Sequence, residues 1–174
     1  MKKIILAFIF LVNYQIAQAA ASSKSQEKPF VDVDLGFASG SYNGSSYSEI
    51  NLSVNLNFTE WLTWRNSGFR RSASNQDKEI IGLDSTMRLI STNHFDGGLV
   101  RLFGGAGYRF ANSSDKNALI GEGGLGVQVG RFGLGVGGKY LKYDKTQYDS
   151  KGLELPNSDM IYFVSVSGGA GLSF

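Results

Sequence analysis

The segment Glu49–Thr59, EINLSVNLNFT, alternates between polar and apolar side chains at every position. The apolar side chains share one face, and they are Ile50, Leu52, Val54, Leu56 and Phe58. A period of two is typical of a β-strand whose two faces meet different surroundings. The run is about ten residues long, which is the length that a tilted strand needs to cross a bilayer. The segment therefore predicts a membrane-spanning strand with one lipid-facing side.

The same alternation occurs eight times and predicts an all-β fold, an eight-stranded antiparallel up-and-down transmembrane β-barrel. We expect the strands at residues 30–39, 49–59, 61–71, 79–90, 98–110, 117–129, 132–143 and 160–174. The third strand is the least regular, and Gly68 is a candidate for a bulge there. We expect shorter connections at 59–60, 91–97 and 130–131, and mostly longer polar ones at 40–47, 72–78, 111–116 and 144–159. Short turns at one end and longer loops at the other are typical of outer-membrane barrels, whose longer loops face outward.

The N-terminus has the features of a secretory signal peptide. Two lysines precede the apolar run Ile4–Val12, and a small-residue Ala-x-Ala site ends at Ala19. The apolar run is too short for a membrane-spanning helix, which needs about 20 residues, although an uncleaved anchor is the alternative. We therefore expect a cleaved leader at 1–20 and one barrel domain at 21–174.

The composition argues against several classes of partner and cofactor. The 174-residue chain has 17 Lys and Arg against 15 Asp and Glu, and loss of Lys2 and Lys3 with the leader leaves 15 of each sign. A neutral mature chain gives no reason to expect nucleic-acid binding. The chain has no cysteine, which excludes disulfides and thiolate metal sites. No other cluster has metal-ligand spacing, so we expect no cofactor and no metal.

Two Gly-x-Gly-x-x-Gly matches begin at Gly121 and Gly133. A dinucleotide site would need a helix after each match, whereas both lie within predicted strands joined by a turn at 130–131. We interpret the glycines as inward positions without bulk. The interior of an eight-stranded barrel is only wide enough for side chains to fill, and long side chains crossing it need that space.

Charged residues alternate onto the face that the barrel turns inward. Because unpaired charges are costly in a narrow lumen, we expect them to form ion pairs. The expected network consists of Asp32, Asp34, Arg65, Asp84, Arg88, Arg101, Glu122 and Lys139. We expect it to be densest in the half near the short turns, where Asp32, Asp34, Arg65, Arg88 and Arg101 should converge. Such a network either fills the lumen as a polar core or gates a narrow ion path.

Aromatic residues gather near both ends of the predicted strands, as expected for two interfacial girdles. The girdle residues are Phe58, Trp61, Trp64 and Phe132 toward the short turns, and Tyr108 and Tyr140 toward the long loops. The single histidine, His94, falls in a predicted short turn, where we expect a surface side chain and no catalytic residue. The acidic residues of 144–159 either bind divalent cations with lipopolysaccharide, contact a host surface, or are merely solvated.

The C-terminal sequence VSVSGGAGLSF ends on Phe174. With Tyr162 and Leu172, this ending resembles the assembly signal of bacterial outer-membrane proteins. Together with the leader and the eight segments, the chain resembles the family of small eight-stranded outer-membrane barrels that includes OmpX and the membrane domain of OmpA. The resemblance implies a monomer in the outer membrane of a Gram-negative bacterium. Its implied partners are the barrel-assembly machinery, membrane lipid and lipopolysaccharide.

The function expected from this resemblance is non-catalytic, with a structural or surface-interaction role and a lumen closed by ion pairs. The first alternative is a narrow channel for ions or small solutes. The second is a lipid-modifying barrel enzyme. The third is a soluble periplasmic barrel of lipocalin type, in which the apolar face would turn inward and the charged face would meet water.

Overall fold

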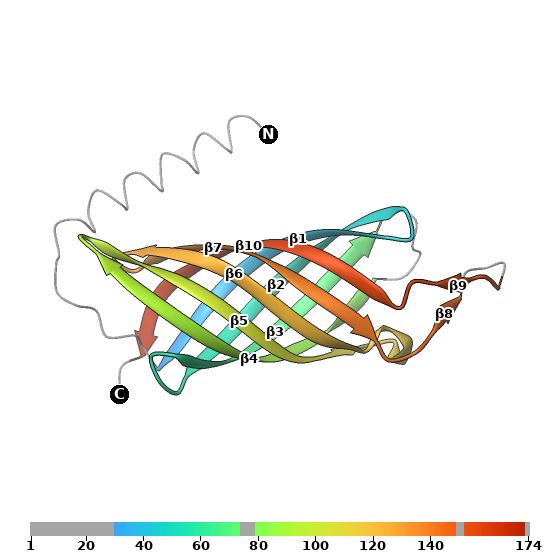
Figure 1. The fold of residues 1–174 in the computed structure, drawn as a ribbon, viewed down its shortest axis with the longest axis horizontal. Helices are drawn as coiled ribbons and strands as arrows, with labels where there is room; N and C mark the ends of the chain where they lie inside the picture. Colours follow the sequence, from blue (N-terminus) through green and yellow to red (C-terminus); the bar gives the residue numbers. More distant parts are fainter. Residues whose placement is uncertain (1–29, 74–78, 149–151, 173–174) are drawn as a thin grey trace, which may run out of the picture.

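Eight antiparallel strands close into a barrel in the computed structural model of the protein (Figure 1). The structure describes residues 30–73, 79–148 and 152–172, with side chains up to Ser167 in the last segment. The barrel strands are β1 (Val31–Tyr42), β2 (Ser45–Asn57), β3 (Leu62–Ala73), β4 (Ile80–Phe95), β5 (Gly98–Ala111), β6 (Ala118–Val129), β7 (Phe132–Tyr143) and β10 (Ser158–Leu172). Each strand pairs with its neighbours in chain order, and β1 pairs with β10 to close the ring. The predicted eight-stranded up-and-down barrel is thus confirmed, whereas the predicted leader at 1–20 lies outside the described residues.

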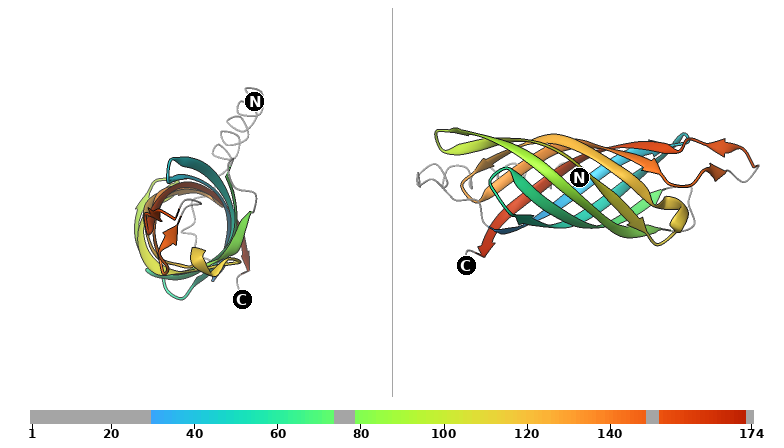
Figure 2. Two further views of the ribbon diagram at one scale, coloured as in Figure 1. Left: turned by 90° about the vertical axis from the view of Figure 1, so that its right-hand side faces the viewer. Right: turned by 60° about the horizontal axis from the view of Figure 1, so that its bottom comes forward.

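Two small elements decorate one end of the barrel, which we call the long-loop end. They are the 3₁₀ turn η1 (Ser114–Lys116) and a hairpin of β8 (Gln147–Tyr148) with β9 (Glu154–Leu155), which extends beyond the rim (Figure 1). The opposite end, which we call the short-turn end, carries the β2–β3, β4–β5 and β6–β7 connections. Viewed along its axis, the barrel is a ring of strands (Figure 2). Among the described residues, no helix is long and apolar enough to cross a membrane.

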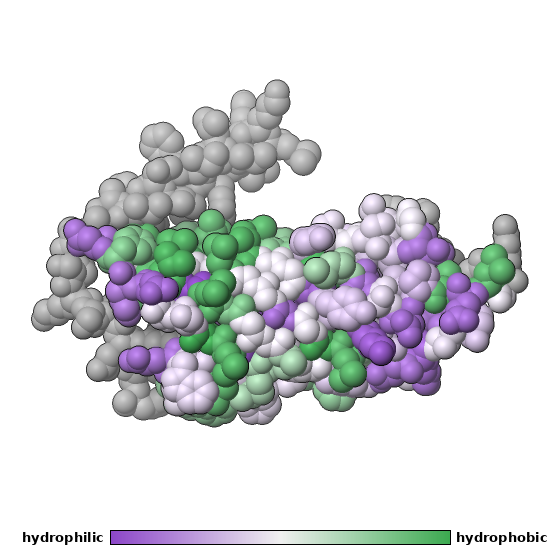
Figure 3. All heavy atoms as spheres, in the orientation of Figure 1, coloured by the Kyte–Doolittle hydropathy of each residue, from purple (hydrophilic) through white to green (hydrophobic). Residues whose placement is uncertain are grey.

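The alternation along each strand turns the apolar side chains outward. On β2, Leu52 is 59% exposed, whereas the neighbouring Ser53 is fully buried inside. Aliphatic side chains on other strands follow the same rule, as Leu134 on β7 shows with 43% exposure. Apolar residues therefore lie across the wall of the barrel, and polar residues gather near β8 and β9 (Figure 3). This orientation contradicts the lipocalin alternative, which requires the apolar face inside.

The β1–β2 connection is shorter than the loop predicted at 40–47. Asn43 and Gly44 form a two-residue turn with φ angles of 50° and 74°. Two consecutive positive φ angles are the requirement of a type I′ hairpin turn, and Asn-Gly is its preferred sequence. Likewise β4 continues to Phe95, so most of the connection predicted at 91–97 belongs to a strand. The expectation that long loops occupy one end is therefore wrong for β1–β2.

The bulge predicted at Gly68 is absent from β3. Gly68 pairs in register with Leu52 on one side and Leu83 on the other. The register shift that the described strands do show lies between Val31 and Val33, where β1 meets β10. Strand β3 keeps its phase because backbone hydrogen bonds hold the register even where outward side chains are small or polar.

Bulky inward side chains lie directly opposite inward glycines on neighbouring strands. Phe103 pairs with Gly124 and Phe163 pairs with Gly137. A Cβ atom added at either glycine would come within 2.7 Å of the facing aromatic ring. The same relation holds for the pairs Phe69–Gly82, Tyr47–Gly40 and Arg88–Gly105. These pairs support the interpretation of the glycines as space for side chains that cross the lumen.

Candidate functional site: the barrel lumen

Six charged side chains form a continuous series of alternating sign across the lumen, which we call the ion chain. Its links are Arg71 Nη1 to Asp159 at 3.3 Å and Arg71 Nε to Glu49 at 3.1 Å. The next links join Arg109 to Glu49 at 2.9 Å and to Asp84 at 2.6 Å, and Lys139 closes on Asp84 at 2.6 Å. In order, the members are Asp159, Arg71, Glu49, Arg109, Asp84 and Lys139. Three positive and three negative charges compensate one another.

Arg109 is the central cation of this chain. Its guanidinium donates two hydrogen bonds to Asp84, at 2.6 and 2.7 Å, and two to Glu49, at 3.0 and 2.9 Å. The guanidinium also lies 3.8 Å from the centre of the Phe69 ring. Arg109 is only 1% exposed. Forked pairing of this kind matches the planar guanidinium to two carboxylates and uses four of its five N–H donors.

A second group of pairs lies deeper toward the short-turn end. Arg65 Nη2 lies 2.9 Å from Asp34 Oδ1. Arg88 donates to both oxygens of Glu122, at 2.7 and 2.9 Å, and Thr86 adds a third hydrogen bond to that carboxylate at 2.6 Å. These pairs tie β1 to β3 and β4 to β6 across the interior.

The structure brings together six of the eight residues expected in the lumen network and leaves two apart. Paired are Asp34 with Arg65, Arg88 with Glu122, and Lys139 with Asp84. Asp32 instead accepts hydrogen bonds from Asn55 and Asn57, at 2.5 and 2.9 Å. Arg101 forms no ion pair with a described residue, and its buried Nε atom has no hydrogen-bond partner among them.

The expectation of greatest density near the short turns is wrong, because the ion chain lies toward the long-loop end. Sequence reasoning omitted four of its members, Glu49, Arg71, Arg109 and Asp159. Glu49 and Arg109 occupy the polar face of their strands, so the alternation alone would have included them. Arg71 lies in the second half of β3, past Asn66, where the alternation is least regular. Asp159 falls in the predicted connection 144–159, although β10 begins at Ser158.

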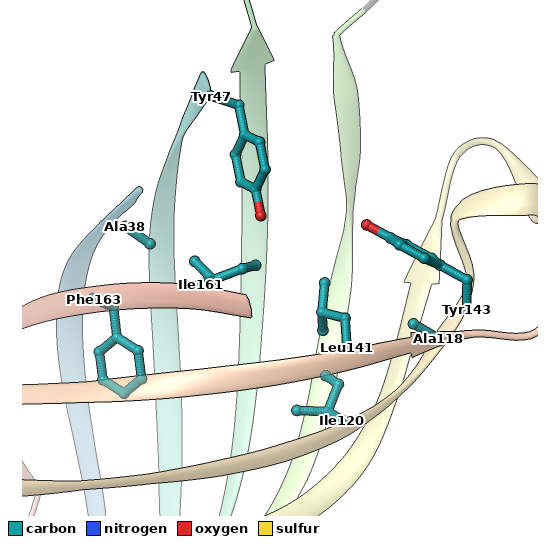
Figure 4. Close-up of a cluster of buried hydrophobic side chains, with 8 residues drawn as sticks. All are labelled: Ala38, Tyr47, Ala118, Ile120, Leu141, Tyr143, Ile161 and Phe163. Atoms are coloured by element: carbon teal, nitrogen blue, oxygen red, sulfur yellow. The ribbon is translucent and has the colours of Figure 1, made fainter. Parts of the chain in front are cut away.

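Apolar side chains fill the lumen beside the ion chain, which the sequence analysis did not anticipate. The buried cluster consists of Ala38, Tyr47, Ala118, Ile120, Leu141, Tyr143, Ile161 and Phe163 (Figure 4). The hydroxyl groups of Tyr47 and Tyr143 both donate to Asp159, the latter at 3.2 Å. The cluster thus joins the ion chain at its β10 end, and the two together occupy the long-loop half of the interior.

A cavity of about 100 Å³ remains in the short-turn half. Asp32 and Asp34 lie on one wall, Arg88 and Arg101 on another. The remaining wall is made largely of small inward residues of β6, β7 and β10. The five residues predicted to converge here do so only in part, because Arg65 points its guanidinium at Asp34 and does not line the cavity.

Side-chain contacts hold the connections at the long-loop end in place. Lys116 donates to Gln147, and Tyr42 donates to the Pro156 carbonyl at 2.5 Å. Burial lowers the pKa of the Lys116 ammonium, against the opposing attraction of Asp115. These contacts tie η1 and the β8–β9 hairpin to the rim.

The acidic residues of the β7–β10 connection do not act as one group. Asp159 is buried in the ion chain, and Asp144 accepts a hydrogen bond from Tyr108. Glu154 is exposed on β9, whereas Asp149 lies outside the described residues. Within the described ranges, no cluster of three or more His, Asp or Glu side chains is arranged to hold a metal ion. The expectation of an exposed acidic loop is therefore wrong for Asp159.

The remaining predicted positions lie on the outer surface. The expected girdle residues Phe58, Trp61, Trp64 and Tyr140 are exposed, and Tyr108 and Phe132 are half-buried. His94 is exposed, on β4 and not in a turn. In the expected assembly signal, Tyr162 is 66% exposed, Leu172 ends β10, and Phe174 lies outside the described residues.

A scan against protein-family models finds no match to this chain, and neither does a search of curated protein sequences.

Proposed function

We propose that the chain is an outer-membrane β-barrel of a Gram-negative bacterium, with a structural or surface-interaction role and a closed lumen. The observation that supports this most strongly is the inversion of its faces. Aliphatic side chains cover the outside, while charged residues are buried and paired inside. Monomeric soluble proteins rarely expose a continuous apolar patch of such extent, so this outer surface suits contact with lipid better than contact with water.

The height of the apolar surface fits a bilayer. On β5, outward apolar residues run from Val100 to Phe110. Ten steps of about 3.3 Å on a strand tilted by about 40° give a height of about 25 Å. This equals the apolar band of about 25 Å that surrounds outer-membrane barrels. The leader proposed at 1–20 would deliver the chain to that membrane, and its C-terminal strand would engage the assembly machinery.

A closed lumen follows from how the interior is filled. Leu141 and Ile161 are fully buried on the axis side of the wall, and the ion chain satisfies its charges internally. A water-filled path would have to displace both. The carboxylates of the ion chain are all held in ion pairs, which favours a non-catalytic role in which the outer surface and loops meet lipid, lipopolysaccharide or other partners.

Two measurements test this proposal. The expressed full-length chain should fractionate with outer membranes and migrate faster before boiling than after it in detergent gels. Recovery in the soluble periplasmic fraction would contradict it. A variant lacking residues 1–20 is the matched control and should remain inside the cell.

Planar-bilayer recordings separate the closed barrel from the channel alternative. We expect no stable conductance steps from the refolded protein. Steady steps that change when Arg88 is replaced by glutamine would instead favour a gated channel, because Arg88 belongs to the lumen pairs.

A further inference from the structure

The cavity at the short-turn end differs from the rest of the lumen because small residues line it. Gly133 and Gly135 on β7 face Ser167 and Ser165 on β10 across their hydrogen-bonded register. At other inward glycines, such as Gly82, Gly105 and Gly124, a ring or an arginine from the opposite strand covers the position. Here the facing residue is a serine, so a volume of about 100 Å³ stays open.

Two of the four charged residues on the cavity wall are already committed to partners. Asp34 is paired with Arg65 at 2.9 Å. Arg88 is held by Glu122 at 2.7 Å and lies 4.4 Å from the centre of the Phe103 ring. These two groups therefore shape the cavity without offering it a free charge.

The other two charges, Asp32 and Arg101, have no ion partner among the described residues. Asp32 is oriented by hydrogen bonds from the amides of Asn55 and Asn57, which are neutral donors and do not cancel its negative charge. Arg101 faces the same cavity from β5, with its buried Nε atom unsatisfied by any described residue. The two attract each other across the cavity but do not meet within ion-pair distance, so a carboxylate and a guanidinium that lack a direct ion partner among the described residues face the same small cavity.

We propose that this cavity binds a small zwitterion of the size of a free α-amino acid. The ligand carboxylate would pair with Arg101, and its ammonium group would pair with Asp32. A guanidinium recognises carboxylate in a forked geometry, and an oriented carboxylate accepts from an ammonium. The cavity of about 100 Å³ is of the same order as the cavity of about 150 Å³ that holds benzene, which limits the ligand to roughly six heavy atoms.

The cavity does not continue through the lumen toward the long-loop end. The Arg65–Asp34 and Arg88–Glu122 pairs border the cavity on its inner side, and the ion chain and apolar cluster fill the lumen beyond. The site is thus a blind receptor pocket at the short-turn mouth. The inference goes beyond the proposed function, because it concerns the lumen and not the membrane.

The test is an NMR titration of the full mature barrel in detergent micelles with L-alanine as the probe. Acetate and ethylamine, each carrying one of the two charges, serve as half-ligands. We expect saturable shifts at the Gly133 and Gly135 amides with alanine, and binding at least about tenfold weaker with either half-ligand. Acetate that binds as tightly as alanine would overturn the zwitterion assignment, and non-saturating shifts would overturn the site.

Variants locate the binding. Arg101→Gln and Asp32→Asn should each weaken alanine binding by about ten- to hundredfold, because each removes one charged hydrogen-bonding partner. Arg131→Gln, at an exposed arginine in the β6–β7 turn near the same mouth, is the matched control and should bind as the parent does. Ser165→Leu keeps every charge but fills the cavity and should abolish binding.

The migration of each unboiled sample shows independently whether the barrel has formed. A folded parent that does not bind alanine would refute the pocket while leaving the barrel assignment intact. Equal binding by the parent and a folded Arg101→Gln variant would also refute it.

Discussion

Replacing Arg109 with glutamine removes the central cation of the ion chain. The arginine makes four hydrogen bonds to two buried carboxylates, whereas glutamine reaches one of them at most. Glu49 would keep Arg71 and Asp84 would keep Lys139, but the chain would carry one uncompensated negative charge. Breaking a buried ion pair in this way costs about 3–5 kcal/mol of unfolding free energy.

Urea unfolding of the barrel in detergent micelles measures this loss. The outward-facing Trp61 and Trp64 supply a fluorescence signal that reports on the lipid-facing wall. At a slope of about 2 kcal/mol per molar urea, the midpoint of Arg109→Gln should fall by about 2 M. The matched control is Arg70→Gln, because Arg70 also pairs with a carboxylate, that of Glu79, but on the exposed outer surface. We expect no measurable change for that control, since solvent screens exposed pairs.

A second substitution distinguishes charge imbalance from lost packing. Adding Glu49→Gln to Arg109→Gln restores equal numbers of positive and negative charges in the ion chain. The double variant should therefore lose less than the sum of the two single variants, with a coupling of about 1–3 kcal/mol. Equal midpoints for Arg109→Gln and Arg70→Gln would refute the reasoning, and strict additivity would show that the charges do not act together.

Two further substitutions test the packing of the lumen and the role of the outer wall. Gly124→Ala should destabilise the barrel by about 1–3 kcal/mol in the same urea assay, because the new methyl group would meet the Val136 carbonyl oxygen and the Phe103 ring. Gly121→Ala, which has open space around the added Cβ atom, should be close to neutral, and equal effects would disprove the packing argument. In lipid vesicles, Leu52→Lys should lower the free energy of unfolding by about 2–4 kcal/mol if Leu52 faces the bilayer core. The control Leu153→Lys, in the β8–β9 hairpin, should change it little. An unchanged stability of Leu52→Lys would count against a lipid-facing wall.

The sequence predicts best those strands whose two faces differ most. Strands β5 to β7 combine outward aliphatic residues with inward glycine or charge, and their phase is unambiguous. In β3 the outward positions Asn66, Gly68 and Arg70 are polar or small, so the contrast between the faces disappears. The strand persists there through its hydrogen-bonded neighbours, which a single segment of sequence does not reveal.

The apolar cluster was missed for a related reason. Around Ile161 and Phe163 both faces of β10 are apolar, so the alternation of polar and apolar residues is lost where the interior itself is apolar. A rule that assigns apolar residues to the outside has no way to detect an apolar interior layer. By contrast, the Asn-Gly sequence at Asn43 and Gly44 is sufficient to predict a two-residue hairpin turn, but small polar residues on both sides make a longer loop look equally plausible.

The pairing within the ion chain lay beyond sequence reasoning altogether. Alternation tells which side chains face inward, but not their height along the axis. That height depends on strand tilt and stagger, which bring Glu49 on β2 level with Arg109 on β5 although three pairings separate these strands.

Three links of the ion chain join strands that are not neighbours in the sheet. Arg71 on β3 reaches Asp159 on β10, and Glu49 and Asp84 likewise meet cations from across the interior. No single hairpin contains both partners of these ion pairs, so the pairs form only when the barrel is closed. Separation of β1 from β10 would remove Asp159 from Arg71 and leave its charge unpaired beside apolar side chains. The barrel should therefore resist sideways opening as a whole and unfold slowly, without a half-open form along the way.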